Sequence, residues 1–476
     1  MSKEVLERTI RRARERNMII PTYEQMRDPS KVPESIKEEL KGIGLWDLHP
    51  RNLFRITWKN DPETGGFDGA NYMELPYELT GVEARIFVLI GKFFPTGSHK
   101  VGATFGPLVS RLVTGTFDPT TQKALWPSTG NYCRGGAYDS YLLGCPSIAV
   151  LPEGMSKERF EWLKKVGAEI YPTPGVESNV KEVFDKTKEL KRKRPKEIVV
   201  LNQFEEFGNP MWHYAVTGPA MEEVYLKERK RGESFTALFL TQGSAGTLGS
   251  ANYLRERFPE IKICAGEALQ CPTLLYNGFG GHRIEGIGDK HVPWILDSKN
   301  LDMVAGIDDE ACMHLVRLFN ENEGRNVLKA RGVPSEVVEK LDLLGISSIA
   351  NILGAIKMAK YYEMDEKDII FTVATDSMEL YRSRLREMGP GYTEMQASGD
   401  FERYLQGATT DWMAELSYRD KKRIHNLKYF TWIEQQGKSI EELNEQWYSR
   451  DYWKKKLNYK KLDRRIKEFN RMVGLI

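Results

Sequence analysis

Several features that would direct a first interpretation are scarce or missing in this sequence of 476 residues. The seven histidines form no H-E-x-x-H pattern, and the N-terminal segment has no long apolar core, which argues against a signal peptide or a membrane span. The cysteines are few, odd in number and without C-x-x-C spacing: Cys133, Cys145, Cys264, Cys271 and Cys312. We therefore expect no disulfide framework and no metal site, and we expect a reducing, cytoplasmic location.

An excess of charge of one sign is also missing. The 69 Lys and Arg residues nearly balance the 67 Asp and Glu residues, which leaves a net charge of +2. This balance argues against nucleic acid or a membrane surface as a partner. The basic run at 188–197 is interpreted as a solvated helix end. The chain is too long for a single core, so we expect two domains or one domain with large extensions.

Short runs of β-branched and apolar residues recur along the middle of the chain. Each leads into Gly, Asn, Pro or Ser and then into a segment of helical length, such as 156–169, which Ser156 can cap and Gly167 can end. Strands that alternate with helices predict an α/β fold with a parallel sheet covered by helices. The predicted strands are 84–92, 146–153, 197–204, 236–243, 261–268 and 368–376.

The two ends of the chain differ from this pattern. Residues 1–80 are polar, and we expect an extension of helices and loops there. The segment 391–476 is polar and aromatic, and Ser439 and Glu442 have the spacing of a capping box. We interpret this second segment as a helical extension that packs on the core or on a neighbouring subunit.

Three loops of unusual composition follow predicted strands, where ligands of open α/β sheets bind. The loop at 128–138, "STGNYCRGGAY", is rich in donors and suits a carboxylate or another small anion. The loop at 242–250, "QGSAGTLGS", has small residues that suit a phosphate, but it is neither G-x-G-x-x-G nor a P-loop. The phosphate therefore belongs to something other than ATP or NAD. The glycine-rich loop at 281–293 is a lid or an irregular crossover.

A lysine stands at the start of another predicted helix. In "PTGSHKVGA", residues 95–103, Lys100 follows His99, and Ser98 is a plausible N-cap. The helix dipole disfavours a cation at this position, and a lysine that loses its proton can attack a carbonyl. Pyridoxal phosphate carries both a phosphate and a carbonyl, and an amino-acid substrate carries the carboxylate.

These motifs together resemble those of the fold-type II pyridoxal-phosphate enzymes, the tryptophan synthase β superfamily. The similarity is greatest to the cysteine synthase and cystathionine β-synthase branch and covers roughly residues 80–390. It includes the segments 151–170, 202–223, 345–348 ("GISS") and 374–381 ("ATDSMELY"). The resemblance implies a homodimer and a two-domain fold. The large cofactor-binding domain would comprise 81–104 and 216–390, the small substrate domain 105–215, and the extensions 1–80 and 391–476.

The resemblance also implies roles for individual residues. Lys100 would be the Schiff-base lysine and the general base at the substrate Cα. The cofactor would be bound by Lys100, His99, Asn131, Gly243, Ser244, Ala245, Gly246, Thr247 and Ser347, with Ser348 as the replacement for Ser347 if the register slips. The substrate carboxylate would be bound by Ser128, Thr129, Gly130 and Gln203.

The sequence departs from the family pattern at positions close to these residues. Tyr132 and Cys133 replace Thr-Gly after the asparagine, and we interpret Cys133 as a small buried apolar residue. Ala245 replaces a glycine of the phosphate loop, which is tolerable if its backbone is not left-handed. These departures leave the leaving group and the incoming nucleophile open.

Three functions are compatible with the residues. The first is β-replacement on an activated serine-type amino acid through an aminoacrylate, because a neutral serine at the ring nitrogen favours elimination over transamination. The second is a lyase or dehydratase that releases sulfide, ammonia or water. The third is a pyridoxal-phosphate-binding partner subunit or regulator, although the intact set of site residues argues against it.

Overall fold

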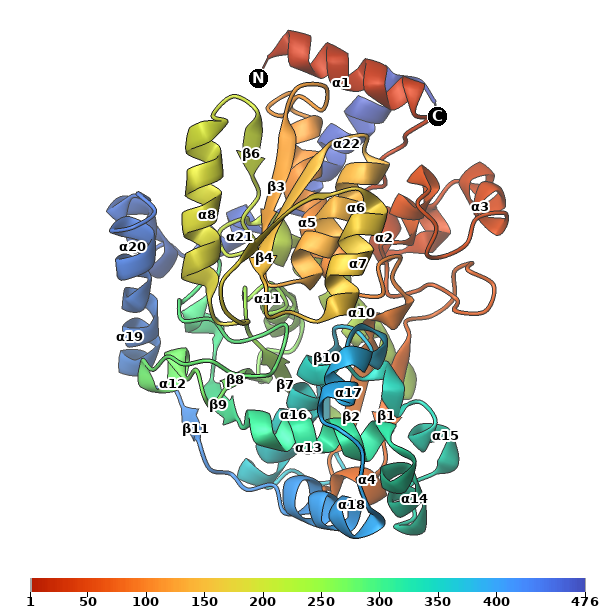
Figure 1. Ribbon diagram of the computed structural model, residues 1–476, viewed down its shortest axis with the longest axis vertical. Coiled ribbons are helices and arrows are strands. Elements are labelled where there is room, and N and C mark those ends of the chain that lie inside the picture. The colour runs from red at the N-terminus through yellow and green to blue at the C-terminus, as the bar shows by residue number, and fades with distance from the viewer. Residues whose placement is uncertain (1, 476) are drawn as a thin grey trace.

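Two β-sheets organise the computed structural model, which describes residues 2–475 (Figure 1). The larger sheet has the strand order β1-β2-β10-β7-β8-β9-β11. Its strands are β1 (Tyr72–Leu75), β2 (Arg85–Ile90), β7 (Ser234–Thr241), β8 (Lys262–Ala268), β9 (Met303–Ile307), β10 (Asp368–Ala374) and β11 (Met413–Glu415). The smaller sheet has the order β5-β4-β3-β6. Its strands are β3 (Lys123–Pro127), β4 (Ser147–Pro152), β5 (Glu169–Thr173) and β6 (Ile198–Val200).

The prediction of an α/β fold is confirmed. All six predicted strands are present, and the neighbouring strands of both sheets run parallel except at two edges of the larger one. At those edges β1 pairs antiparallel with β2, and β11 pairs antiparallel with β9. The central strands are buried along almost their whole length, as expected for parallel sheets covered by helices on both faces.

The helices that cover the sheets lie between the strands in the chain. They are α5 (Lys100–Leu112), α6 (Asn131–Leu142), α7 (Lys157–Val166), α8 (Val180–Lys193), α9 (Gly208–Trp212), α10 (Gly218–Glu228), α11 (Gly249–Arg257), α12 (Thr273–Tyr276), α13 (Asp309–Asn320), α14 (Asn322–Ala330), α15 (Ser335–Val338), α16 (Ile346–Tyr361) and α17 (Arg382–Glu387). Ser156 precedes α7 as expected, but its hydroxyl accepts no capping hydrogen bond. Gly167 ends α7 with a left-handed φ of 83°, which agrees with the prediction.

Short helices occur along both ends of the chain. The first 80 residues contain α1 (Lys3–Glu15), α2 (Tyr23–Arg27), α3 (Glu34–Lys41) and α4 (Tyr77–Thr80). The last part contains α18 (Glu394–Asp400), α19 (Tyr418–Lys428), α20 (Ile440–Tyr448), α21 (Tyr452–Lys456) and α22 (Tyr459–Val473). At α20 the Ser439 hydroxyl accepts from the Glu442 N–H, which is one half of the predicted capping box. Each extension also supplies an edge strand of the larger sheet, and the proposed domain boundaries stay a prediction.

The first and last helices pack against each other (Figure 1). The Arg14 Nε donates to the Val473 carbonyl at 2.9 Å. The Asn470 side chain accepts a hydrogen bond from the Ile20 N–H at 3.1 Å and donates one to the Ile20 carbonyl at 2.8 Å. Segments about as far apart in the sequence as the chain allows therefore stabilise one another directly.

A cluster of buried aromatic and aliphatic side chains joins the C-terminal extension to the rest of the molecule. We call it the aromatic bridge; it consists of Val180, Phe184, Phe204, Trp294, Trp432 and Leu443. Trp432 lies in a π-helical turn after α19, and its indole N–H donates to the Val292 carbonyl at 2.8 Å. The buried Lys428 ammonium donates to the carbonyls of Trp294 and Leu296. The extension thus reaches α8, beside which α19 and α20 lie in Figure 1.

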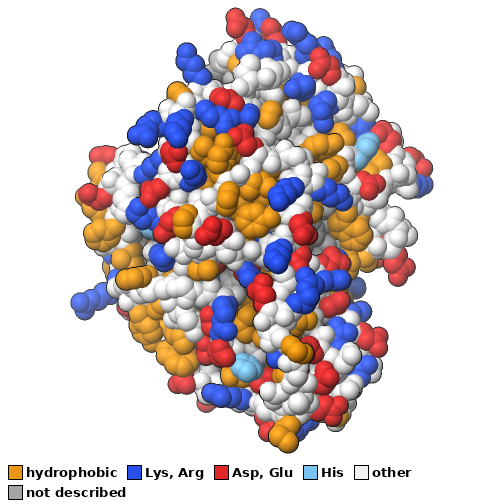
Figure 2. All heavy atoms as spheres, viewed as in Figure 1, with side chains coloured by type: hydrophobic (Ala, Val, Ile, Leu, Met, Phe, Trp, Pro, Cys, Tyr) orange, Lys and Arg blue, Asp and Glu red, His pale blue; other side chains and the backbone are white. Residues whose placement is uncertain are grey.

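Basic and acidic side chains are interspersed over the face drawn in Figure 2, without a broad field of one sign. Within the described part of the chain, no helix is both long and apolar enough to cross a bilayer.

Candidate active site

Lys100 is the first residue of α5, and its side chain lines a narrow cleft. The structure corrects one detail of the predicted helix start, because His99 and not Ser98 is the N-cap residue. Ser98 still contributes, since its hydroxyl accepts the Lys100 N–H at 3.3 Å. Desolvation in the cleft lowers the pKa of the Lys100 amine to about 8, although the charges of Glu177 and Asp376 oppose this shift. About a tenth of the Lys100 amine is therefore neutral at pH 7, far more than for a lysine with the usual pKa.

The cleft lies between loops that follow strands of both sheets. The Lys100 Nζ is 3.4 Å from the Ser244 hydroxyl, which belongs to the loop after β7. The cleft has a volume of about 20 Å³. Of the residues singled out in the sequence, Lys100, Ser128, Thr129, Asn131, Gln203, Gly243 and Ser244 line it. These residues come from segments far apart in the chain, and the fold brings them to one place.

The loop 243–247 joins β7 to α11. Gly246 has no room for a side chain, because a Cβ there would lie 2.0 Å from the Asn209 Oδ1. Asn209 also donates to the Ser244 hydroxyl at 3.1 Å and so fixes the loop from behind. Ala245 has a φ of 64°, which is left-handed. We expected this alanine to be tolerable only if its backbone was not left-handed, and that condition is not met. A left-handed alanine costs on the order of 1 kcal/mol relative to glycine, and the surrounding structure sustains it.

Asn131 lines the cleft, and Ser347 lies next to one of its lining residues. Ser347 is in the first turn of α16, and a Cβ added to the cleft residue Gly286 would lie 3.6 Å from its hydroxyl. Ser348 is directed elsewhere, since its hydroxyl donates to the Asp376 carbonyl at 3.4 Å. The Asn131 amide donates to the Asp376 carboxylate at 2.5 Å. Of the two serines, Ser347 is therefore the one beside the cleft.

His99 does not line the cleft. Its Nε2 lies 3.3 Å from the Thr375 hydroxyl, and its ring packs against His213 and Trp58 at centroid distances of 5.0 and 5.6 Å. Burial lowers the pKa of His99 well below its usual value, so the imidazole is neutral. The histidine therefore packs behind Lys100, and Ala245, Gly246 and Thr247 likewise complete the loop without lining the cleft.

Cys133 is fully buried in the first turn of α6. Its thiol donates to the Gly130 carbonyl at 2.9 Å, and burial raises its pKa to about 12. A thiol that stays protonated is a poor nucleophile, so the structure agrees with the interpretation of Cys133 as a small buried residue.

A buried network of charged residues that was not predicted from the sequence lies next to the cleft. The Arg159 guanidinium lies 2.7 Å from the Glu285 carboxylate and 3.9 Å from the Glu177 carboxylate. It also donates to the Tyr381 hydroxyl at 2.8 Å, which in turn donates to Asp376 at 2.7 Å. The available signal was the position of Glu177 shortly after β5, but this edge strand contains Pro172 and was not predicted.

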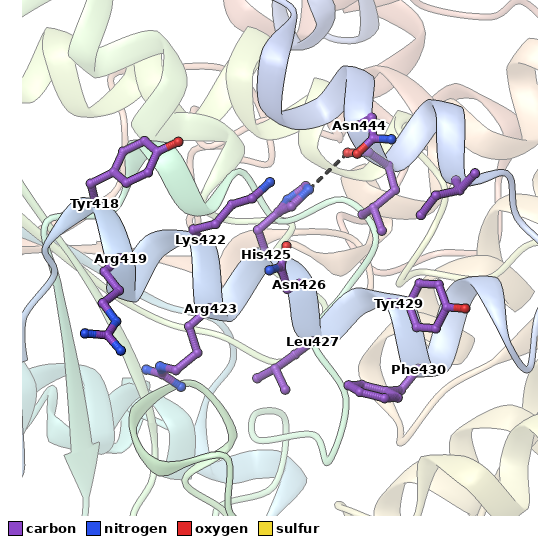
Figure 3. Close-up of a pocket in the computed structure, with 12 residues that line it drawn as sticks. Tyr418, Arg419, Lys422, Arg423, His425, Asn426, Leu427, Tyr429, Phe430 and Asn444 are labelled. Carbon is purple, nitrogen blue, oxygen red and sulfur yellow. Dashed lines mark hydrogen bonds between the residues drawn. The ribbon is translucent and has the colours of Figure 1, made fainter.

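A second and larger pocket carries no comparable chemistry. It has a volume of about 780 Å³ and lies between α19 and α20 in the C-terminal extension (Figure 3). The Nε2–H of its histidine, His425, donates to the Leu443 carbonyl at 3.0 Å. Burial lowers the pKa of His425 to about 3, and no carboxylate lines the pocket. The groups suited to acid–base chemistry line the Lys100 cleft, which is therefore the better candidate for the active site.

Among residues 2–475, no group of three or more His, Cys, Asp or Glu side chains is placed to hold a metal ion.

The comparisons with known proteins agree with this geometry. The family model described as "Pyridoxal-phosphate dependent enzyme" matches residues 72–334, more than half of the chain. A probable cysteine synthase of Bacillus subtilis is 28% identical over 305 residues, which cover 63% of this chain and 89% of that protein. A cysteine synthase of Staphylococcus aureus is 31% identical over 258 residues, which cover 54% and 74%.

A solved structure is also similar. A hydrogen sulfide-producing enzyme of Fusobacterium nucleatum aligns with a TM-score of 0.56 and 26% identity, over 70% of this chain and 93% of that one. The region 72–334 that the family model matches contains Lys100, the loop 243–247 and the turn at 128–131. The chain therefore belongs to the family of pyridoxal-phosphate dependent enzymes and is an enzyme of the cysteine synthase type.

Proposed function

We propose that the protein catalyses β-replacement on an amino acid that carries a leaving group at its β-carbon. The observation that carries this proposal is the position of the Lys100 amine, 3.4 Å from Ser244 in the small-residue loop and in one cleft with Ser128, Thr129 and Gln203. That arrangement supports a phosphate bound on one side of the amine and a carboxylate bound on the other.

The residues of the cleft fit pyridoxal phosphate. The loop 243–247, Lys100, Asn131 and Ser347 would hold it. The loop requires glycine at 246, because a Cβ there would clash with Asn209, and such a small-residue loop before a helix suits a phosphate. Ser347 would offer a neutral hydroxyl to the ring, and Asn131, whose amide donates to Asp376, would offer its side chain by exchanging that hydrogen bond. The neutral His99 ring is held by Thr375 outside the cleft. The bound cofactor would supply an electron sink that allows the Cα–H bond of the substrate to break.

The turn at 128–131 would hold the substrate carboxylate. The Ser128 hydroxyl accepts the Gly130 N–H at 3.1 Å and lies 3.4 Å from the Gln203 amide. The Arg159 guanidinium donates to the Thr129 carbonyl at 3.2 Å and holds the turn from outside the cleft. Hydroxyl, amide and backbone N–H donors together suit a carboxylate, and they fix the substrate by that group.

The base that removes the α-proton would be Lys100. A lysine with a pKa of about 8 is sufficiently neutral to accept a proton and sufficiently basic to retain it. The neutral Ser347 does not compensate a charge on the cofactor ring, which favours prompt loss of the β-substituent over transamination. An incoming nucleophile that bonds to Cβ then completes the replacement. Release of the eliminated product without that bond, and its hydrolysis to a keto acid and ammonia, gives the alternative, a lyase or dehydratase.

The assembly and the division of the chain are also proposals. We propose a homodimer in the cytoplasm, with residues 105–215 as the substrate domain and 81–104 together with 216–390 as the cofactor domain. The complete set of cleft residues argues against a regulator or partner subunit without activity.

Cofactor capture by the apoprotein should depend on pH. Since the neutral amine of Lys100 attacks the carbonyl of the cofactor, the capture rate should rise about tenfold per pH unit below the pKa and level off above it. With the lowered pKa of Lys100, the plateau should begin at a pH of about 8. Stopped-flow absorbance during pyridoxal phosphate binding measures this rate. A rise that continues through the usual lysine range would contradict a desolvated Lys100.

The reaction itself is tested by adding O-acetylserine, serine and cysteine separately to the purified protein. We expect a yellow protein whose visible spectrum changes with one of them, and we expect added sulfide to give cysteine, identified by mass spectrometry. Formation of pyruvate and ammonia without incorporation of the nucleophile would favour the lyase alternative. A protein that stays colourless after addition of pyridoxal phosphate would contradict the proposed function.

A further inference from the structure

Glu177 is a buried carboxyl group that faces the cleft and has no role in the function proposed above. Its side chain is 4% exposed, and it lines the same cleft as Lys100. The Thr129 hydroxyl donates to its Oε1. Its Oε2 makes no hydrogen bond among residues 2–475 and lies 3.9 Å from Arg159. One oxygen of this group is therefore available to a molecule in the cleft.

The charges around Glu177 favour its protonated form. Arg159 is nearer to Glu285, at 2.7 Å, and Glu285 also pairs with Arg384 at 2.5 Å. Asp376 accepts hydrogen bonds from Asn131 and Tyr381. Glu177 therefore has only a distant cation, Arg159 at 3.9 Å, and one hydrogen bond, from Thr129. The other carboxyl that lines the cleft, Asp289, lies 3.2 Å from His291, and Lys100 is the cation that shares the cleft. An ionised Glu177 beside Thr129 would also repel the carboxylate of a substrate bound at this turn.

The pKa of Glu177 agrees with this geometry. Burial raises the pKa to about 8, and the charge of Glu285 adds to the rise. The Arg159 guanidinium, the Thr129 hydroxyl and the backbone N–H of Gly286 oppose it. The group is therefore an acid that can donate a proton near neutral pH and be protonated again.

We propose that Glu177 is the general acid that protonates the group leaving the β-carbon, and that the site is built for amino acids with a poor leaving group such as a hydroxyl. The proposal rests on the proposed function and names its substrate class. Lys100 Nζ takes the α-proton, and the electron pair of the Cα–H bond forms the Cα–Cβ double bond. The Cβ–O bond breaks, its electron pair stays on oxygen, and the oxygen takes the proton of Glu177 and leaves as water.

The second half-reaction restores both groups. The nucleophile, delivered in its protonated form, bonds to Cβ and gives its proton to the Glu177 carboxylate, and Lys100 returns its proton to Cα. A hydroxyl needs this help because the pKa of water is about 15.7, so hydroxide leaves poorly. An acetyl ester does not, because a carboxylate with a conjugate acid of pKa about 4 leaves without a proton.

The test compares two substrates in the holoenzyme and in the Glu177→Gln variant. With serine, kcat should fall about a hundredfold in the variant, the loss typical of a missing general acid. With O-acetylserine, kcat should change less than about threefold, because that step needs no acid. Exchange of the α-hydrogen with solvent deuterium should persist in the variant. Glu161→Gln, an exposed position on α7, is the matched control and should leave both rates unchanged.

A second measurement does not depend on turnover. Infrared difference spectra of the apoprotein, recorded below and above the expected pKa of about 8, should contain the band of a protonated carboxyl that is missing from the Glu177→Gln spectra. Equal losses of kcat with both substrates, or no loss with serine, would overturn the assignment of Glu177 while leaving the proposed function intact. A wild-type protein that converts neither substrate would overturn the proposed function and this inference together.

Discussion

The Lys100→Ala protein should lack the visible absorbance of bound cofactor and should lose at least about a thousandfold in turnover. The alanine cannot bond to the carbonyl of pyridoxal phosphate, and it removes the base at the substrate Cα. The other cleft contacts, including the hydrogen bond from Asn209 to Ser244, do not involve this amine. The variant should therefore fold and retain weak, noncovalent cofactor binding. Absorbance spectra and steady-state rates of the purified variant measure both effects.

A second lysine provides the control for this experiment. Lys357 is also largely buried, and desolvation lowers its pKa, but its ammonium donates to the Asp411 carbonyl away from the cleft. Lys357→Met should keep the cofactor and the turnover of the wild type. If Lys100→Ala retained turnover within about tenfold of the wild type, the chemistry would not depend on Lys100, and the proposed mechanism would be wrong.

Trp432→Ala should lower the free energy of unfolding by about 3 to 5 kcal/mol, the range for truncating a buried tryptophan. Trp432 is completely buried, and its ring packs against Phe184 and Trp294 at a centroid distance of 6.2 Å from each. The substitution leaves a cavity in the aromatic bridge and removes the hydrogen bond to Val292. Urea unfolding followed by tryptophan fluorescence and circular dichroism measures the loss.

The same substitution should weaken substrate binding more than cofactor binding. Val180 and Phe204 belong to the aromatic bridge and also line the cleft, next to Gln203. We therefore expect KM for the amino acid to rise while the affinity for pyridoxal phosphate stays close to that of the wild type. Removal of residues 391–476 should likewise raise KM for the amino acid and leave the affinity for pyridoxal phosphate nearly unchanged. Phe430→Ala, at a side chain that is 62% exposed two positions away, is the control and should change neither property. Loss of cofactor affinity in a folded Trp432→Ala protein would contradict this view.

The parts of the molecule that could be predicted from the sequence depend on local patterns. The strand 236–243 is apolar because β7 is buried on both sides, and a loop of small residues follows it directly. Both the strand and the loop could therefore be predicted from one short stretch of sequence. The same holds for Lys100 at the start of its helix. The roles of these residues stay predictions, but they meet in one cleft because the parallel strands of both sheets lead at their carboxyl ends into the loops that line it.

The features that escaped prediction depend on contacts between distant segments. Arg159, Glu177 and Glu285 come from a helix, a loop after an edge strand and a glycine-rich loop, and no spacing in the sequence links them. The left-handed backbone of Ala245 is likewise imposed by its surroundings, because alanine alone disfavours it. The direction of the His99 side chain away from the cleft is set by Trp58 and His213, which lie far away in the chain.

The packing of α1 against α22 has a consequence for how the protein is made. During synthesis, Ile20 leaves the ribosome long before its hydrogen-bond partner Asn470 has been translated. At typical rates of about 5 to 20 residues per second, this delay lasts some tens of seconds. Over that time α1 can be held only by segments made earlier, as in the ion pair of Arg8 with Asp118, and the surface that α22 covers stays exposed. Helix α1 should therefore gain full protection from proteases only after α22 has been made, later than α3, whose cluster of apolar partners lies within residues 19–54.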